Sequence, residues 1–203
     1  MQRTERTGAG TRFVLVLLVA LFLGACTGAD APRFHSTDIT GADYGKRLAL
    51  TDHEGRPRRL EDFRGKVVTL FFGFTQCPDV CPTSLSTMAT VMNLLGPDAQ
   101  RVQVLFVTVD PERDTEPLLA HYVPAFHPAF LGLRGDAMQT AEVAKEFRVF
   151  YRKSGDTSGM NYTIDHSAGT YLFDPLGRLR LYARHAEGAE NLAADIRLLL
   201  DGR

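Results

Sequence analysis

Two long and mainly apolar runs constrain the fold of this chain more than any other feature. The first run, VVTLFF, covers residues 67–72, and the second, VQVLFVTV, covers residues 102–109. Unbroken apolar runs of this length are typical of strands that are covered on both faces, as in a parallel sheet. The segment between them suits a helix that is capped by Thr83 or Ser84 and stops before Gly96. The runs therefore predict a strand–helix–strand unit with a right-handed connection.

The rest of the chain continues this alternation of strands and helices. We expect two short strands within residues 47–60, helices at 116–126, 137–147 and 187–200, a strand at 129–133, and a hairpin formed by 169–174 and 178–182. Asp136 is placed to cap the second of these helices. This order predicts an α/β chain with a thioredoxin-like fold, elaborated by an N-terminal β extension and a hairpin insertion.

Residues 1–25 have the pattern of a secretory signal peptide. Basic residues are followed by an apolar run over residues 13–23, which is shorter than the roughly 20 residues that a membrane-spanning helix needs. The sequence LGAC, which ends at Cys26, is similar to the lipobox of bacterial lipoproteins, whose cysteine becomes lipidated after cleavage. An ordinary signal peptide or an uncleaved anchor is the alternative. We expect a tether at 26–36 and a folded domain at 37–203.

Composition limits the partners and the role of the cysteines. The net charge of −1 gives no reason to expect nucleic acid as a partner. The chain has three cysteines, and lipidation of Cys26 would leave Cys77 and Cys81 as the free thiols of the folded domain. This is not a disulfide-rich scaffold. A single pair of cysteines in an exported domain favours a chemical role over the alternative of a plain stabilising disulfide.

Cys77 and Cys81 lie in the sequence FGFTQCPDVCP, directly after the first apolar run. Their C-x-x-x-C spacing is one residue longer than the C-x-x-C of thioredoxin-type redox sites. If a helix begins within CPDVCP, the two thiols face the same way, and the helix N-terminus favours the thiolate form. Such a pair can close as a disulfide or bind a soft metal such as Cu(I) or Zn(II). The residues alone leave a redox pair, a metal-ligand pair, or both.

Two thiolates leave a metal under-coordinated, so we looked for a third ligand among the six histidines. Five of them fit a solvated or core position better than a metal site: His35, His53, His121, His127 and His185. His166 differs because it directly precedes a predicted strand and is followed by the small residues Ser167, Ala168 and Gly169.

Three motifs together resemble the Sco/SenC family, the copper proteins of cytochrome oxidase assembly. They are FGFTQCPDVCP, VTVDPERDT and DHSAGTYLFDPLGRL, and the resemblance covers roughly residues 37–200. It implies a thioredoxin-like domain that is tethered to a membrane outside the cytoplasm. It also implies that Cys77, Cys81 and His166 bind copper as Cu(I), Cu(II) or both.

Other positions of these motifs have roles that the resemblance suggests or puts in doubt. Asp165 matches the acid beside the histidine and is placed to accept a hydrogen bond that orients the imidazole, although a capping or surface role fits equally. The loop at 110–115, DPERDT, is expected mainly to cap a helix. Gln76 stands where the motif often has a histidine, so a fourth histidine ligand is not available there.

For function, the resemblance implies a copper chaperone that is tethered in the periplasm or on the outer side of the cytoplasmic membrane. Many members of the family have a transmembrane anchor, whereas the motif at Cys26 predicts a lipid anchor here. It would take copper from a donor chaperone and help to load the binuclear copper site of cytochrome c oxidase subunit 2. Such a chaperone is not an enzyme. The alternative is a thiol–disulfide oxidoreductase in which Cys77 and Cys81 keep the client's cysteines reduced. A copper or redox sensor is a third interpretation.

Overall fold

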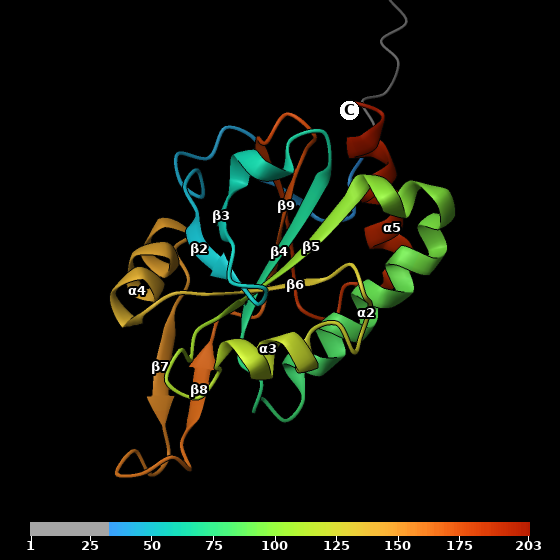
Figure 1. Ribbon diagram of the computed structural model, residues 1–203. Helices are drawn as coiled ribbons and strands as arrows, with labels where there is room; N and C mark the ends of the chain where they lie inside the picture. The colour runs from blue at the N-terminus through green and yellow to red at the C-terminus, as the bar shows by residue number, and fades with distance from the viewer. Residues whose placement is uncertain (1–32) are drawn as a thin grey trace, which may run out of the picture. The chain divides into compact units, whose positions relative to one another are not determined.

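The computed structural model describes residues 33–203, which form an eight-stranded mixed sheet with helices on both faces (Figure 1). The strand order is β1-β10-β9-β4-β5-β6-β2-β3. The strands are β1 (Thr37–Asp38), β2 (Ala49–Asp52), β3 (Pro57–Arg59), β4 (Val67–Gly73), β5 (Val102–Thr108), β6 (Leu131–Arg134), β9 (Thr170–Phe173) and β10 (Leu179–Ala183). The expected signal peptide and the lipidation site at Cys26 lie outside the described residues.

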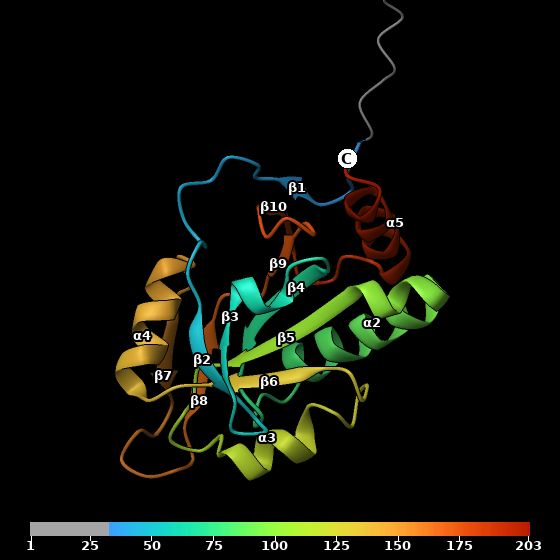
Figure 2. The same cartoon turned by 45° about the horizontal axis from the view of Figure 1, so that its top comes forward.

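In the described part of the chain, four α-helices and two short 3-10 helices surround the strands. They are η1 (Leu60–Phe63), α2 (Val80–Leu95), η2 (Gly96–Arg101), α3 (Glu116–Tyr122), α4 (Ala137–Glu146) and α5 (Ala189–Leu200). Helices α2 and α5 pack together on one side of the sheet and α4 lies on the other (Figures 1 and 2). Within residues 33–203, no helix is both long enough and apolar enough to cross a bilayer. The α/β, thioredoxin-like fold predicted from the element order is confirmed.

Strands β4 and β5 form the centre of the sheet, as their apolar runs predict. They pair in parallel from Val67 beside Val102 to Gly73 beside Thr108, and every residue of both strands is buried. Each large apolar side chain buried in this way contributes about 1.5–3 kcal/mol to folding. The end of β4, where the thiol loop begins, is therefore anchored in the most stable part of the molecule.

The predicted start of α2 at Thr83 or Ser84 is wrong, because the helix begins at Val80 after Asp79 as N-cap residue. Pro82 does not prevent this, since the N–H that proline lacks has no partner in the first turn of a helix. Cys81 therefore lies in the first turn of α2.

The other element boundaries agree within two residues, with one larger difference at α3. The cap of α4 by Asp136 is confirmed, because its carboxylate accepts the backbone N–H of Gln139. The predicted helix 116–126 ends at Tyr122, since Pro124 cannot continue it.

The β extension and the inserted hairpin are both present. At the N-terminus, β1 adds to one edge of the sheet and the β2–β3 hairpin to the other. The insertion consists of β7 (Tyr151–Ser154) and β8 (Thr163–His166), which form a separate two-stranded sheet. The predicted hairpin at 169–182 is confirmed as β9 and β10, but β7 and β8 are not among the strands expected from the sequence. That second hairpin supplies His166.

Two hairpin turns of the main sheet share the pattern Asp-x-x-Gly-Arg-x-Arg. In each, a buried aspartate, Asp52 or Asp174, accepts backbone N–H groups two and four residues later. Each carboxylate also accepts an arginine Nε at 2.7 Å, from Arg58 or Arg178. The glycine of each turn has positive φ, which only glycine adopts without strain. These aspartate–arginine pairs stabilise the hairpin turns and lie apart from the thiols.

Candidate metal centre

Three potential metal ligands from different elements converge at the end of β4. The ligand atoms of Cys77, Cys81 and His166 all lie within 4.8 Å of one another. Cys77 lies in the loop after β4, Cys81 in the first turn of α2, and His166 at the end of β8. The chain thus brings together residues that are 85 positions apart.

The two cysteines are free thiols with different surroundings. Cys81 is buried, whereas Cys77 is partly exposed and its Sγ accepts the backbone N–H of Cys81 at 3.4 Å. Burial raises the pKa of the Cys81 thiol, and its hydrogen bond with Cys77 raises it further. A Cβ at Gly73 would lie 2.7 Å from Cys81 Sγ, so only glycine leaves room for this sulfur. Cys77 is the sulfur that a partner protein can reach.

His166 presents its Nε2 to the buried thiol. Nε2 lies 3.5 Å from Cys81 Sγ, and Nδ1 lies 3.0 Å from the carbonyl oxygen of Ser167. Because a carbonyl oxygen only accepts, Nδ1 carries the proton and Nε2 has a free lone pair. Burial lowers the pKa of His166, although the Ser167 carbonyl and the charge of Asp165 oppose this. The imidazole is therefore neutral near pH 7, the form that binds metals.

Asp165 contacts another partner. Its half-exposed carboxylate pairs with Arg152 at 3.5 Å, and the imidazole Nδ1–H donates to the carbonyl oxygen of Ser167. Asp165 acts on His166 through its charge, and its expected role as the orienting acceptor stays a prediction.

A pocket of about 240 Å³ opens beside the ligand cluster. Its walls are mainly apolar and come from the thiol loop and from β8; they include Phe74, Cys77, Pro78, Val80, Ile164 and His166. Cys81 does not line it. A partner that approached through this pocket would meet Cys77 and His166 first.

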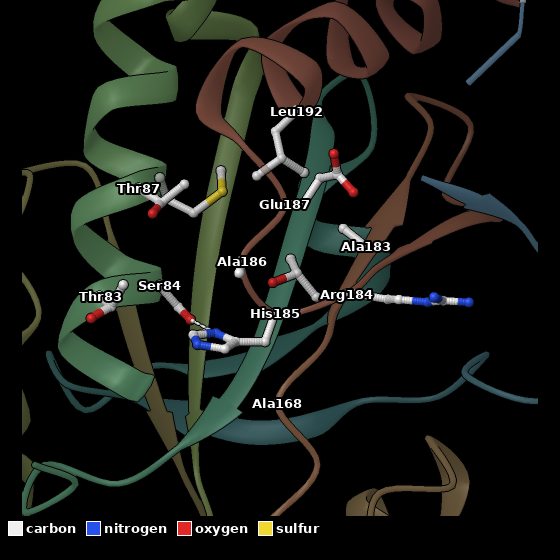
Figure 3. Close-up of a pocket in the computed structure, with 12 residues that line it drawn as sticks. Thr83, Ser84, Thr87, Ala168, Ala183, Arg184, His185, Ala186, Glu187 and Leu192 are labelled. Atoms are coloured by element: carbon white, nitrogen blue, oxygen red, sulfur yellow. Dashed lines mark hydrogen bonds between the residues drawn. The ribbon is translucent and has the colours of Figure 1, made fainter. Parts of the chain in front are cut away.

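A second, smaller pocket of about 30 Å³ contains His185 (Figure 3). The Nδ1 atom of His185 lies 3.5 Å from Ser84 Oγ on α2, as the dashed line in Figure 3 marks. Across residues 33–203, no carboxylate is hydrogen-bonded to the His185 ring, so the pair lacks the third member of a hydrolase triad. Within the described residues, the cluster of potential metal ligands consists of Cys77, Cys81 and His166, and His185 is not part of it.

The loop at 110–115 does more than the helix capping expected of it. Thr115 does cap α3. Asp110, Arg113 and Asp114, however, are buried. Their burial could not be predicted from the sequence, because charged residues in a polar loop resemble surface residues. The DPERDT motif itself was the only signal that pointed to them.

The donor set suits copper. Two sulfurs and one imidazole nitrogen match the preferences of Cu(I), and imidazole also binds Cu(II). The convergence of the three donors, with Gly73 leaving room for the sulfur of Cys81, fits such an ion.

Comparison with known proteins agrees with this geometry. The family model described as SCO1/SenC matches residues 36–201. The chain is 44% identical over 201 residues to "Protein SCO2 homolog, mitochondrial" of Bos taurus, covering 94% of this chain and 75% of the relative. It is 42% identical to the Mus musculus homologue, covering 74% of this chain and 60% of that protein. The copper-bound structure of Bradyrhizobium japonicum ScoI superposes with a TM-score of 0.71 at 39% identity, covering 78% of this chain and 100% of that one.

Proposed function

The chain belongs to the SCO1/SenC family, and we propose that it is a copper-binding protein of cytochrome c oxidase assembly. In this proposal it works outside the cytoplasm as a chaperone. It accepts copper from a donor protein and helps to deliver it to the binuclear copper site of oxidase subunit 2.

The observation that supports this proposal most directly is the convergence of Cys77, Cys81 and His166. A solved relative at 39% identity was determined with copper bound. The ligand set of three leaves room at the metal for a ligand from another protein. Since Cys77 is the reachable sulfur, we expect exchange with a client to begin on its side of the site.

Copper titration of the reduced protein under anaerobic conditions tests the site. We expect one tightly bound equivalent of Cu(I), which is lost when Cys77 or Cys81 is replaced by serine and weakened by His166→Ala. Unchanged binding in His166→Ala would refute the assignment of the third ligand.

The same thiols favour a second candidate, a thiol–disulfide oxidoreductase. Cys77 is partly exposed and can attack a disulfide, and Cys81 lies beside it as a resolving thiol. The discriminating measurements are the reduction potential of the pair and turnover with a disulfide substrate. Rapid turnover that copper does not affect would favour the oxidoreductase, and a sensor would show copper binding without delivery to a client.

Anchoring is also part of the proposal. We infer that cleavage before Cys26 leaves a lipidated N-terminal cysteine that holds the domain at the outer side of the membrane. Mass spectrometry of the N-terminal peptide tests this directly. A mature chain that starts elsewhere, or an unmodified Cys26, would contradict it.

A further inference from the structure

The loop at 110–115 contacts the residues that lead into the thiol pair. The buried carboxylate of Asp114 accepts the backbone N–H of Thr75 at 3.1 Å and its hydroxyl at 2.6 Å. The same carboxylate accepts the hydroxyl of Thr108, at the end of β5, at 2.6 Å. Thr75 lies two residues before Cys77, so this contact fixes the thiol loop to the core.

Arg113 joins the thiol loop to the hairpin that contains His166. Its Nη1 atom donates to the side-chain oxygen of Gln76 at 3.0 Å. It also donates to the carbonyl oxygens of Met160 at 3.0 Å and Tyr162 at 2.7 Å. Gln76 directly precedes Cys77, and Tyr162 directly precedes β8. One guanidinium nitrogen therefore holds both segments that enter the metal centre.

The guanidinium is itself held on several sides. Its Nε donates to Asp110 at 2.5 Å, and the Tyr162 hydroxyl donates to the same carboxylate at 2.8 Å. The guanidinium carbon also lies 3.7 Å from the centroid of the Tyr162 ring. The side chains of Arg113 and Asp110 are only 3% and 1% exposed.

The contacts of Arg113 favour a role in positioning the metal centre over a role in stabilising the fold. A buried ion pair is a weak source of stability, because both charges lose their hydration. Within residues 33–203, the buried Nη2 atom of Arg113 has no hydrogen-bond partner, which is an added cost. The hairpin β7–β8 belongs to a separate sheet. Apart from Arg113, the loop 110–115 bonds to it through Asp110, which accepts the Tyr162 hydroxyl, and through the exposed pair Lys153–Glu112.

We propose that Arg113 is a positioning residue that holds the imidazole of His166 against the thiols of Cys77 and Cys81, and so sets the affinity for copper. This inference rests on the proposed copper-binding function. Arg113 touches none of the three ligands in this role. It acts through the backbone of Tyr162 on one side and the side chain of Gln76 on the other.

The test is Arg113→Lys in the reduced full-length protein. Lysine keeps the charge beside Asp110 but lacks the planar fork that reaches several acceptors at once. Competition with a chromophoric Cu(I) chelator should show an affinity loss of about tenfold or more. Combined with His166→Ala, the substitution should cause no further loss, because there is no imidazole left to position. In the metal-free protein, the NMR resonances of the His166 ring should shift or broaden.

Two further variants complete the design. Arg178→Lys makes the same substitution in another arginine–aspartate pair, in which Asp174 is buried but Arg178 is exposed, in a turn that lies apart from the thiols. It should leave copper affinity unchanged. Gln76→Leu changes an exposed side chain, so the protein should still fold. It should reproduce part of the loss of copper affinity that Arg113→Lys causes.

Several results would overturn the inference. One is a wild-type copper affinity in Arg113→Lys. Another is a double variant whose loss of copper affinity equals the sum of the losses in Arg113→Lys and His166→Ala. Unperturbed ring resonances in the metal-free variant would do the same. If the wild-type protein bound no copper, the proposed function would fail, and the NMR comparison would still decide whether Arg113 positions His166.

Discussion

The two halves of the metal centre are held by different kinds of structure. The sulfur half lies at the junction of β4 and α2, where β4 is buried throughout and Gly73 leaves space for Cys81. The imidazole half ends a two-stranded hairpin outside the main sheet. The first half grows out of the buried central strand and is fixed further by Asp114. The second half lies outside the main sheet, and the contacts of Arg113 and the packing of His166 against Phe71 and Phe74 hold it in place. We infer that the thiols are the constant part of the site and that His166 is its adjustable part.

Cys81→Ser should have the largest effect on copper binding. Serine nearly matches the shape of cysteine beside Gly73 but replaces a soft ligand with a hard one. We expect the Cu(I) affinity to fall by more than the roughly 100-fold that loss of an outer partner costs a metal site. Chelator competition measures the affinity, and thermal unfolding checks that the fold is intact. A folded variant that retained tight binding would remove the sulfur half from the site.

His166→Ala should have a smaller effect, because both thiols remain. We expect an affinity loss of about 10- to 100-fold, with a changed spectrum of the Cu(II) form. His185→Ala is the matched control, since His185 also contacts α2 but lies in the separate pocket with Ser84. If the losses in His166→Ala and Cys81→Ser were equal, the proposed difference between the two halves would be wrong.

The pH dependence of copper affinity should also distinguish the sulfur half of the site from the imidazole half. Because burial raises the pKa of Cys81, its proton must leave when copper binds, and binding should weaken as pH falls. Each thiol proton released on binding changes the affinity about tenfold per pH unit, so Cys81 alone predicts a change of at least about tenfold per pH unit between about pH 6.5 and 8. The pKa of His166 is lowered, so its protonation adds nothing in that range.

Affinity measurements across this range in wild type and His166→Ala check the prediction. Parallel slopes are expected, because the proton comes from the sulfur half. An affinity that did not change with pH would show that Cys81 is already a thiolate or is no ligand.

The same contrast explains which parts could be predicted from the sequence. The strands β4 and β5 were visible because burial on both faces leaves an unbroken apolar run. The hairpin was not located, because YRKS and TIDH are short and largely exposed, and neither shows a decisive apolar alternation. The burial of Arg113 and Asp110 was invisible, since a sequence does not show which charged residues a neighbouring hairpin covers.

Asp174→Asn should have the smallest effect on copper, and it tests whether buried aspartates in general matter to the site. Burial opposes ionisation of Asp174, but its bonds with Arg178 outweigh this and the net pKa is lowered. Its contribution to stability is thus present at neutral pH and is lost as pH falls through that lowered pKa. Weakening these bonds should cost about 1–3 kcal/mol in urea unfolding at pH 7, and less in acid. Copper affinity should not change, because the turn closes β9 and β10 and contacts neither half of the site. A parallel loss of copper affinity would mean that general loosening of the fold, rather than the specific contacts of Arg113, controls the position of His166.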